Sequence, residues 1–330
     1  MGADRRQHAD MRLQRLWRRA WFQGWYFKQV SADEKTAICF IPGISLHDGT
    51  RGSFIQAILA QRTGEGWRQS SDWLDYPPLT ARDEPFSIAL DGGEFRRNGI
   101  RVDYKGERLR AEGELRIGPL TPPPASLWAP TVMGPFAYLP GMECIHSVIS
   151  MNHALSGTLR INGEAVDFSG GKGYVEKDWG SSFPRRYVWL QSNHFAREGS
   201  LFFSWADIPA LGTSFGGHIA HLWYGGGHHR YATYTRGSCR VTPRGNEVDV
   251  LLRNAYSTLE ISAVQAEGAR LVAPRRGRMV DTIKEGLFGR LSFCLKKDGE
   301  PRIIVDDSEV AGVEIVFEKG RVTPDSLPEA

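Results

Sequence analysis

Short runs of alternating apolar and polar residues occupy most of the chain, and turn-forming pairs separate them at intervals of roughly ten residues. Residues 88–118 are typical of a meander of antiparallel strands, since glycine turns divide this stretch into short alternating segments. The four turns predicted there are Asp91-Gly92, Asn98-Gly99, Lys105-Gly106 and Glu112-Gly113. Hairpins are also predicted at Asn162-Gly163, at 225–227 and at Asp298-Gly299.

Helical periodicity is confined to residues 12–22 and to "MVDTIKEGLFG", residues 279–289. Gly and Pro interrupt almost everything else, so the pattern predicts an all-β protein with barrels or sandwiches. The corner near Pro184 is the best candidate for a boundary between two β lobes. The predicted division is a basic N-terminal segment over 1–20, lobes over 21–183 and 184–320, and a tail over 321–330.

The amino-acid composition indicates the class of protein and the kind of partner to expect. The chain of 330 residues is 41% hydrophobic and 24% charged, which is typical of a globular protein. Its 41 Lys and Arg residues nearly balance 38 Asp and Glu residues, so a nucleic-acid partner is not expected. Ten Trp, ten Tyr and sixteen Phe suit strands and cavities with aromatic walls.

No motif indicates a metal or a cofactor. The nine histidines show no HExxH and no Cys–His ligand spacing, and no nucleotide-binding glycine loop opens a helix. The four cysteines, Cys39, Cys144, Cys239 and Cys294, lie far apart and suit buried structural positions; the alternative is a nucleophilic Cys144 beside His146. We therefore expect neither a metal nor a cofactor.

The N-terminal region carries no apolar block of the secretory type, and no run is long enough to span a bilayer, so a cytoplasmic location is expected. In residues 12–22, Leu13, Leu16 and Trp17 fall at helical spacing and arginines flank them. This segment is either a basic amphipathic helix that contacts a membrane surface or an arm that packs on its own domain.

The densest candidate chemistry lies in "GYVEKDWG", residues 173–180. In a strand, Glu176 and Asp178 share one face and Lys177 points to the other. Two carboxylates in apolar surroundings repel each other, so one of them would keep its proton to a raised pH and act as a Brønsted acid. The alternative is a buried ion network, closed by Trp179, that plugs the mouth of a barrel.

Aromatic and amide residues surround this segment in the sequence. The following strand places Tyr187, Trp189, Gln191 and Asn193 on one face, a mixture that suits a ligand cavity. Upstream, Glu143 and His146 begin another strand, and Gly24-Trp25-Tyr26 either admits a close neighbour or simply packs in the core.

Three stretches together resemble the tocopherol cyclase family: "WFQGWYFKQV", "MGPFAYLPGMECIHSVISMNHALSGTL" and "GYVEKDWGSSFPRRYVWLQSNHF". The resemblance runs from about Trp21 to about Leu291. It implies a pair of lipocalin-like antiparallel β-barrels. It also implies an isomerase that closes the chromanol ring of a prenylated hydroquinone, as in vitamin E biosynthesis, without a cofactor.

Carried onto this sequence, the resemblance implies Asp178 as the acid, tuned by Glu176 and Lys177, with Glu143 as its rival. Trp25, Trp179 and Trp189 would line the cationic region, and Tyr26, Gln191 and Asn193 would orient the hydroxyls of a lipophilic substrate. Tyr187 and His146 complete the expected substrate-binding set.

The chain departs from the family pattern at two places. Gln23 stands where Glu is expected, and His146-Ser147 stands where Trp-Gln is expected. The substrate can therefore differ, and two other functions stay open: a non-enzymatic carrier of a lipophilic quinone or isoprenoid, and a carotenoid hydratase-like enzyme. A carrier needs the aromatic cavity but not the acid.

Overall fold

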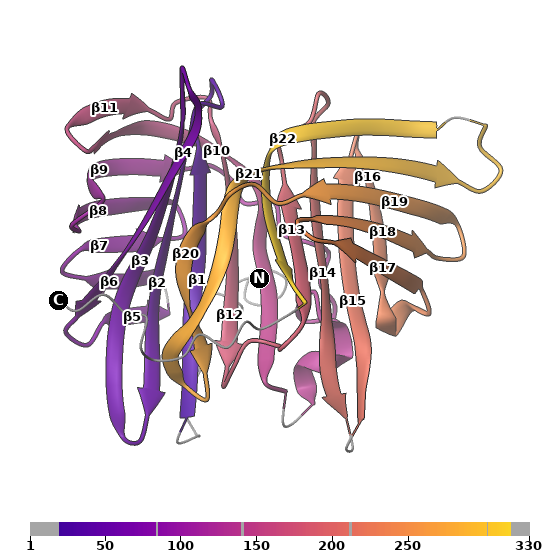
Figure 1. Cartoon of the computed structure of the whole chain (residues 1–330), viewed down its shortest axis with the longest axis horizontal. Coiled ribbons are helices and arrows are strands. Elements are labelled where there is room, and N and C mark those ends of the chain that lie inside the picture. Colours follow the sequence, from indigo (N-terminus) through magenta and orange to yellow (C-terminus); the bar gives the residue numbers. More distant parts are fainter. Residues whose placement is uncertain (1–19, 84, 140–141, 211–212, 302, 318–330) are drawn as a thin grey trace.

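The computed structural model describes residues 20–83, 85–139, 142–210, 213–301 and 303–317. These residues form two large antiparallel sheets that stand side by side (Figure 1). The predicted all-β class and its two antiparallel lobes are therefore confirmed. The basic segment expected before residue 20 lies outside the described residues, although Ala20 already belongs to the first strand.

The first sheet holds twelve strands in the order β4-β3-β2-β1-β12-β10-β9-β8-β7-β6-β5, with β11 paired to β10. Their bounds are β1 (Ala20–Val30), β2 (Thr36–His47), β3 (Thr50–Thr63), β4 (Gly66–Tyr76), β5 (Thr80–Asp83), β6 (Phe86–Leu90), β7 (Gly93–Arg96), β8 (Gly99–Lys105), β9 (Arg110–Ile117), β10 (Cys144–Ile161), β11 (Glu164–Asp167) and β12 (Lys172–Gly180).

The second sheet holds ten strands in the order β16-β15-β14-β13-β22-β21-β19-β18-β17, with β20 paired to β21. Their bounds are β13 (Tyr187–Ser192), β14 (Gly199–Ala210), β15 (Thr213–Tyr224), β16 (Gly227–Ala232), β17 (Ser238–Arg244), β18 (Glu247–Arg253), β19 (Ser257–Val264), β20 (Ala269–Arg275), β21 (Arg278–Lys297) and β22 (Ile303–Val316). The 3-10 helices are η1 (Gly134–Tyr138) and η2 (Thr233–Thr235). None of the helices in the described part of the chain has the length and apolar character needed to cross a lipid bilayer.

Most predicted turns join strands as expected, but two local predictions are wrong. Glu112-Gly113 lies inside β9, where Gly113 has φ +134° and the carbonyl of Thr158 leaves no room for a Cβ. Residues 279–289 belong to β21 and not to a helix, because burial there alternates residue by residue before the strand enters the core.

Three apolar clusters hold the lobes together. One fills the first lobe around Trp25, Phe27 and Phe95, and another fills the second lobe around Val188, Phe203 and Phe293. The third joins the lobes through residues that include Tyr26, Trp189, Phe202 and Leu287. Because strands alternate, Tyr26 and Trp189 turn outward from their own lobes and meet there, with ring centroids 5.6 Å apart.

The β20–β21 hairpin links the lobes in a second way. It belongs to the second sheet, yet it contacts β1, β2, β3 and β4 of the first. At its turn, the Gly277 N–H donates to Ser181 O, and the Phe183 N–H donates to Pro274 O. The hairpin therefore covers one side of the space between the two sheets.

Candidate active site

A cavity of about 340 Å³ lies between the lobes. Strands of both sheets and the β20–β21 hairpin contribute to its walls, and the third apolar cluster lies around it. Much of the wall is apolar, including Phe22, Ile41, Phe54, Met133, Phe136, Phe183, Ile219, Leu271 and Ile283. A mostly apolar cavity with a few convergent polar groups is the usual form of a small-molecule site.

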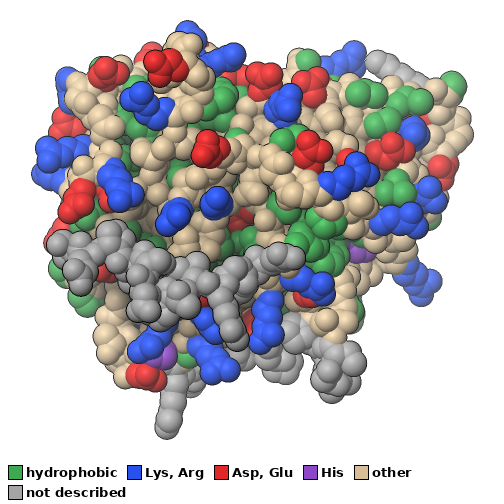
Figure 2. Space-filling view, viewed as in Figure 1, with side chains coloured by type: hydrophobic (Ala, Val, Ile, Leu, Met, Phe, Trp, Pro, Cys, Tyr) green, Lys and Arg blue, Asp and Glu red, His purple; other side chains and the backbone are tan. Residues whose placement is uncertain are grey.

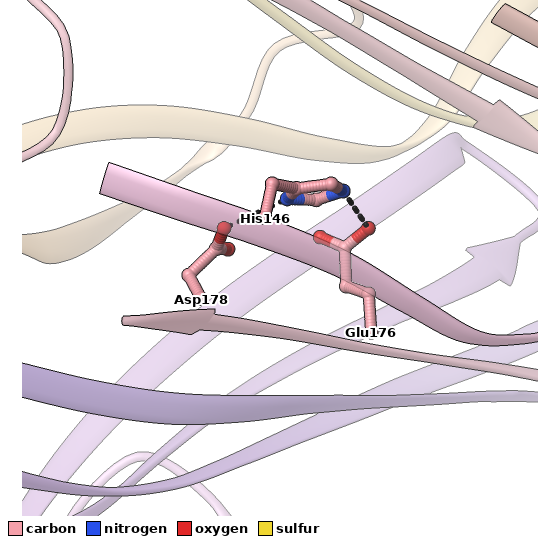
Figure 3. A group of neighbouring side chains, drawn as sticks. All are labelled: His146, Glu176 and Asp178. Carbon is pink, nitrogen blue, oxygen red and sulfur yellow. Dashed lines mark hydrogen bonds and ion pairs between the residues drawn. The ribbon is translucent and has the colours of Figure 1, made fainter. Parts of the chain in front are cut away.

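The first polar group in the cavity is the triad His146, Glu176 and Asp178 (Figure 3). His146 on β10 lies opposite Asp178 on β12 in the antiparallel register, and Glu176 is two residues back along the same strand. His146 Nδ1 is 2.7 Å from Asp178 Oδ1, and His146 Nε2 is 3.3 Å from Glu176 Oε2. The imidazole stacks on Phe202, with ring centroids 5.0 Å apart and an interplanar angle of 7°.

The two carboxylates determine the charge of the imidazole. Burial lowers the pKa of His146, but Asp178 and then Glu176 outweigh this effect and raise it to about 10. His146 is therefore an imidazolium at neutral pH, and it donates its Nδ1 proton to Asp178. Cys144 Sγ is 3.7 Å from the same Asp178 oxygen, and burial raises the pKa of this thiol, so the geometry does not favour Cys144 as a nucleophile.

Glu176 is held as a hydrogen-bond acceptor. Its Oε2 accepts from the hydroxyl of Tyr174 at 2.5 Å and from Nε1 of Trp189 at 3.0 Å, in addition to its contact with His146. These contacts hold the Glu176 side chain next to the imidazole.

A second carboxyl pair, Glu285 on β21 and Glu314 on β22, also lines the cavity. The two strands are paired with Gly286 opposite Val313, so the carboxyl groups are cross-strand neighbours that can share one proton. Tyr26 donates its hydroxyl proton to Glu285 Oε1, and Tyr187 donates to Glu314 Oε2 at 2.7 Å.

Burial keeps this pair from ionising fully. It raises the pKa of Glu285 despite the hydrogen bond from Tyr26, and burial together with the charge of Glu285 raises the pKa of Glu314 well above its usual value. Glu176 adds a further unfavourable charge to both. The cavity thus contains a carboxyl group that keeps its proton at neutral pH.

Sequence reasoning missed Glu285 and Glu314. Each stands alone among residues that carry no motif, and Glu285 fell in the stretch wrongly interpreted as helical. The signal that could have found them is a charged residue at an inward position of a buried strand. The side chains of Glu285 and Glu314 are 1% and 8% exposed, respectively.

Seven of the residues expected in the site line the cavity: Tyr26, Glu143, His146, Glu176, Asp178, Tyr187 and Trp189. Glu143 is exposed at its edge, just before β10. The other five, Trp25, Lys177, Trp179, Gln191 and Asn193, do not line it.

Strand alternation explains why Trp25 on β1 and Lys177 and Trp179 on β12 do not line the cavity. Trp25 belongs to the interior cluster of the first lobe, on the face of β1 opposite to Tyr26. Lys177 is fully buried, with Nζ 5.4 Å from the Trp25 ring centroid and 4.5 Å from that of Trp179. These residues pack behind the carboxylates instead of contacting a ligand.

The two amides beyond Trp189 have structural partners. Gln191 Oε1 accepts from the ammonium of Lys28 at 3.1 Å, and Asn193 Nδ2 donates to Gly173 O at 2.9 Å. Asn193 follows the end of β13, so the face expected to run from Tyr187 to Asn193 ends earlier. Both amides join the lobes next to the cavity.

The triad also has the composition of a metal site. His146, Glu176 and Asp178 each offer one ligand atom, and these atoms lie within 4.8 Å of one another. Two of these atoms, His146 Nδ1 and Asp178 Oδ1, lie at hydrogen-bond distance from each other.

The fold and this cavity define an all-β protein with two lobes and an acidic pocket between them. A family model described as tocopherol cyclase-like matches residues 128–316, more than half of the chain. The chain therefore belongs to the tocopherol cyclase-like family. A search of curated proteins finds no match.

Solved structures with a similar fold are distant in sequence. The crystal structure of CghA with Sch210972 has a TM-score of 0.58 at 12% identity, covering 91% of this chain and 89% of that one. Kievitone hydratase from Nectria haematococca gives a TM-score of 0.47 at 11% identity, covering 90% and 88%. A putative AttH from Nitrosomonas europaea gives 0.46 at 12%, covering 90% and 92%. At 12% identity, the similarity to the CghA structure supports the fold alone.

Proposed function

We propose that the chain is an enzyme that protonates an alkene of a lipophilic substrate bound between the lobes. In the specific form that the family suggests, it cyclises a prenylated hydroquinone to a chromanol. The observation that carries this proposal is the Glu285–Glu314 pair, two buried carboxyl groups on paired strands at the wall of an apolar cavity, where burial raises the pKa of both.

Acid strength favours this pair over the triad as the proton donor. An imidazolium whose pKa is about 10 gives up its proton reluctantly, and Asp178 accepts a hydrogen bond from it. A carboxyl group whose pKa is raised to near neutrality is both protonated and reactive. Asp178 and the exposed Glu143 remain rival donors.

The reaction conserves atoms and electrons. The carboxyl proton adds to one alkene carbon, which leaves a tertiary cation and a carboxylate. The phenol oxygen then bonds to the cation, and its proton passes to a carboxylate in the cavity. No electrons are transferred to an acceptor, so the proposed reaction needs no redox cofactor.

The cavity residues suit each stage of this reaction. Tyr26 and Trp189 offer aromatic faces to the cation, each worth on the order of 1 kcal/mol. The charged triad supplies anionic oxygens that can receive the phenol proton. The apolar wall limits the access of water, which would otherwise capture the cation and give a hydrated product.

The test is conversion of a prenylated hydroquinone, followed by mass spectrometry of the product. Glu285→Gln and Glu314→Gln should each lower the rate by about 10²–10⁴-fold. Glu260→Gln, at an exposed ion pair with Lys296, serves as the matched control and should keep the wild-type rate.

Three outcomes would contradict parts of the proposal. Loss of activity only in Asp178→Asn or Glu143→Gln would move the proton donor to that residue. Full activity in all four variants would remove acid catalysis by these carboxyl groups. Tight binding of the hydroquinone by the wild-type protein, with no conversion, would support the carrier function instead.

A further inference from the structure

Several large apolar side chains are exposed near the cavity. Trp128 is 82% exposed, and Leu127, Tyr138, Leu139 and Phe215 also present much of their surface to solvent. Four of the five lie between Leu127 and Leu139, and Phe215 joins them from β15 through its contact with Phe136 at 6.2 Å between ring centroids. Isolated exposed apolar residues are common, but a contiguous group marks an interaction site.

The loop that carries Leu127 and Trp128 is fixed in place. The backbones of Ser126 and Ala129 bond to each other in both directions, at 2.9 and 3.2 Å, which leaves the two apolar residues at the tip. The Tyr138 hydroxyl donates to Leu127 O at 2.9 Å. Ala129 is buried next to this tip. The exposure of Trp128 is thus a feature of an ordered loop.

This apolar group is continuous with the entrance of the cavity. Phe136, Leu139 and Phe215 line the cavity, and Leu139 and Phe215 are also exposed. A lipophilic molecule could therefore pass from the exposed group into the cavity along an apolar surface.

Arginines gather on another side of the same entrance. Arg185 and Arg186 follow Phe183 and Pro184, which line the cavity, and Arg275, Arg276 and Arg278 form the turn of the β20–β21 hairpin beside it. All five are exposed. The two segments contact each other, since the Arg276 N–H donates to Ser182 Oγ at 2.9 Å. Figure 2 shows Lys and Arg side chains along the lower part of this face, where the turn lies in Figure 1.

We propose that this surface docks on an anionic lipid bilayer and lets the cavity open directly onto it. Trp and Tyr favour the boundary between lipid and water, and arginines are attracted to anionic headgroups. Docking at this surface does not depend on the proposed chemistry.

The test is co-sedimentation of the full chain, without substrate, with vesicles of phosphatidylglycerol and phosphatidylcholine. The wild-type protein should bind these vesicles, bind pure phosphatidylcholine more weakly, and bind less as salt is raised. Leu127→Ser and Trp128→Ser together should weaken binding by about tenfold or more. Arg275→Gln and Arg278→Gln should each weaken it by about fivefold.

The matched control is Tyr256→Ser with Val305→Ser, which removes two equally exposed apolar side chains at the other end of the second lobe. Circular dichroism and thermal unfolding establish that each variant folds. Failure of the wild-type protein to bind, or equal losses in the control and in the Leu127 and Trp128 variant, would overturn the proposal. So would a dimer in solution that this variant dissociates, because the surface would then be an interface between two copies.

Discussion

His146 carries a positive charge because two carboxylates surround a buried imidazole. His153, on the same strand, shows the contrast. His153 is buried with Ser150 as its hydrogen-bond partner, and burial lowers its pKa to about 3. The same residue type is therefore charged at one end of β10 and neutral further along the strand.

Spectra of the protein with ¹⁵N-labelled histidine should show this contrast directly. At pH 8, His146 should give the signals of a doubly protonated ring, and His153 those of a neutral ring. Neutral signals for His146 at that pH would contradict the charge assigned to the triad.

The charge on His146 also affects stability. Its pKa in the folded protein lies above the ordinary value of 6.5, so the stabilisation is complete below about pH 6.5 and is lost as the pH rises through about 10. We expect the free energy of unfolding in urea to fall by on the order of 2–4 kcal/mol over this range. His146→Gln should remove most of this slope; an unchanged slope in that variant would assign the pH dependence to other groups.

Sequence reasoning found the triad region because Glu176 and Asp178 are two residues apart in one strand, and strand alternation is a local rule. It did not find Glu285 and Glu314, because only the pairing of β21 with β22 and the packing of both against β1 and β13 bring them to Tyr26 and Tyr187. The family resemblance placed Trp25 and Lys177 in the site, although strand alternation already directed Lys177 to the face opposite Glu176 and Asp178.

At the scale of elements, the β20–β21 hairpin forms one wall of the cavity between the sheets. Its turn contains Gly277 at φ +77°, where an added Cβ would lie 2.3 Å from Leu46 O and 2.4 Å from Trp21 N. This close approach to β1 and β2 is possible only for glycine. The helical pattern in residues 279–289 misled the prediction because the outward positions of β21 include Val280 as well as charged residues.

Gly277→Ala should therefore destabilise the protein by more than the cost of placing an alanine at a positive φ, because the added Cβ also meets backbone atoms of the first sheet. Gly299→Ala is the matched control, because Gly299 has φ +78° in the β21–β22 turn and nothing within 4 Å of its Cβ position. Both should lose about 1 kcal/mol to the left-handed backbone, and Gly277→Ala about 1–3 kcal/mol more. Equal losses in urea unfolding would show that the hairpin turn tolerates displacement from the first sheet.

At the scale of the whole molecule, the apolar cluster between the lobes joins two units that each have an interior cluster of their own. The antiparallel pairing of strands that follow one another in the sequence results from alternation and turns, so this part of the fold could be predicted. The faces through which the two lobes meet could not be predicted, because outward residues such as Tyr26 and Phe202 are of the same types as inward ones.

A large interface should make the two lobes unfold together. Leu287 is fully buried in the cluster between the lobes, and Leu287→Ala should lower the free energy of unfolding by about 2–5 kcal/mol in a single transition. Val305→Ala, at an exposed position, should change it by less than about 0.5 kcal/mol. Two separate transitions in either protein would show that the lobes are independent units.

The pairing of β13 with β22 has a consequence for biosynthesis. β13 is the first strand of the second sheet in sequence order, yet one of its two neighbours is β22, the last of the described strands, which carries Glu314. A nascent polypeptide therefore cannot bring Glu314 to Tyr187 until β22 has left the ribosome. A chain that ended before β22 would lack Glu314, although the sequence of the first lobe would be intact.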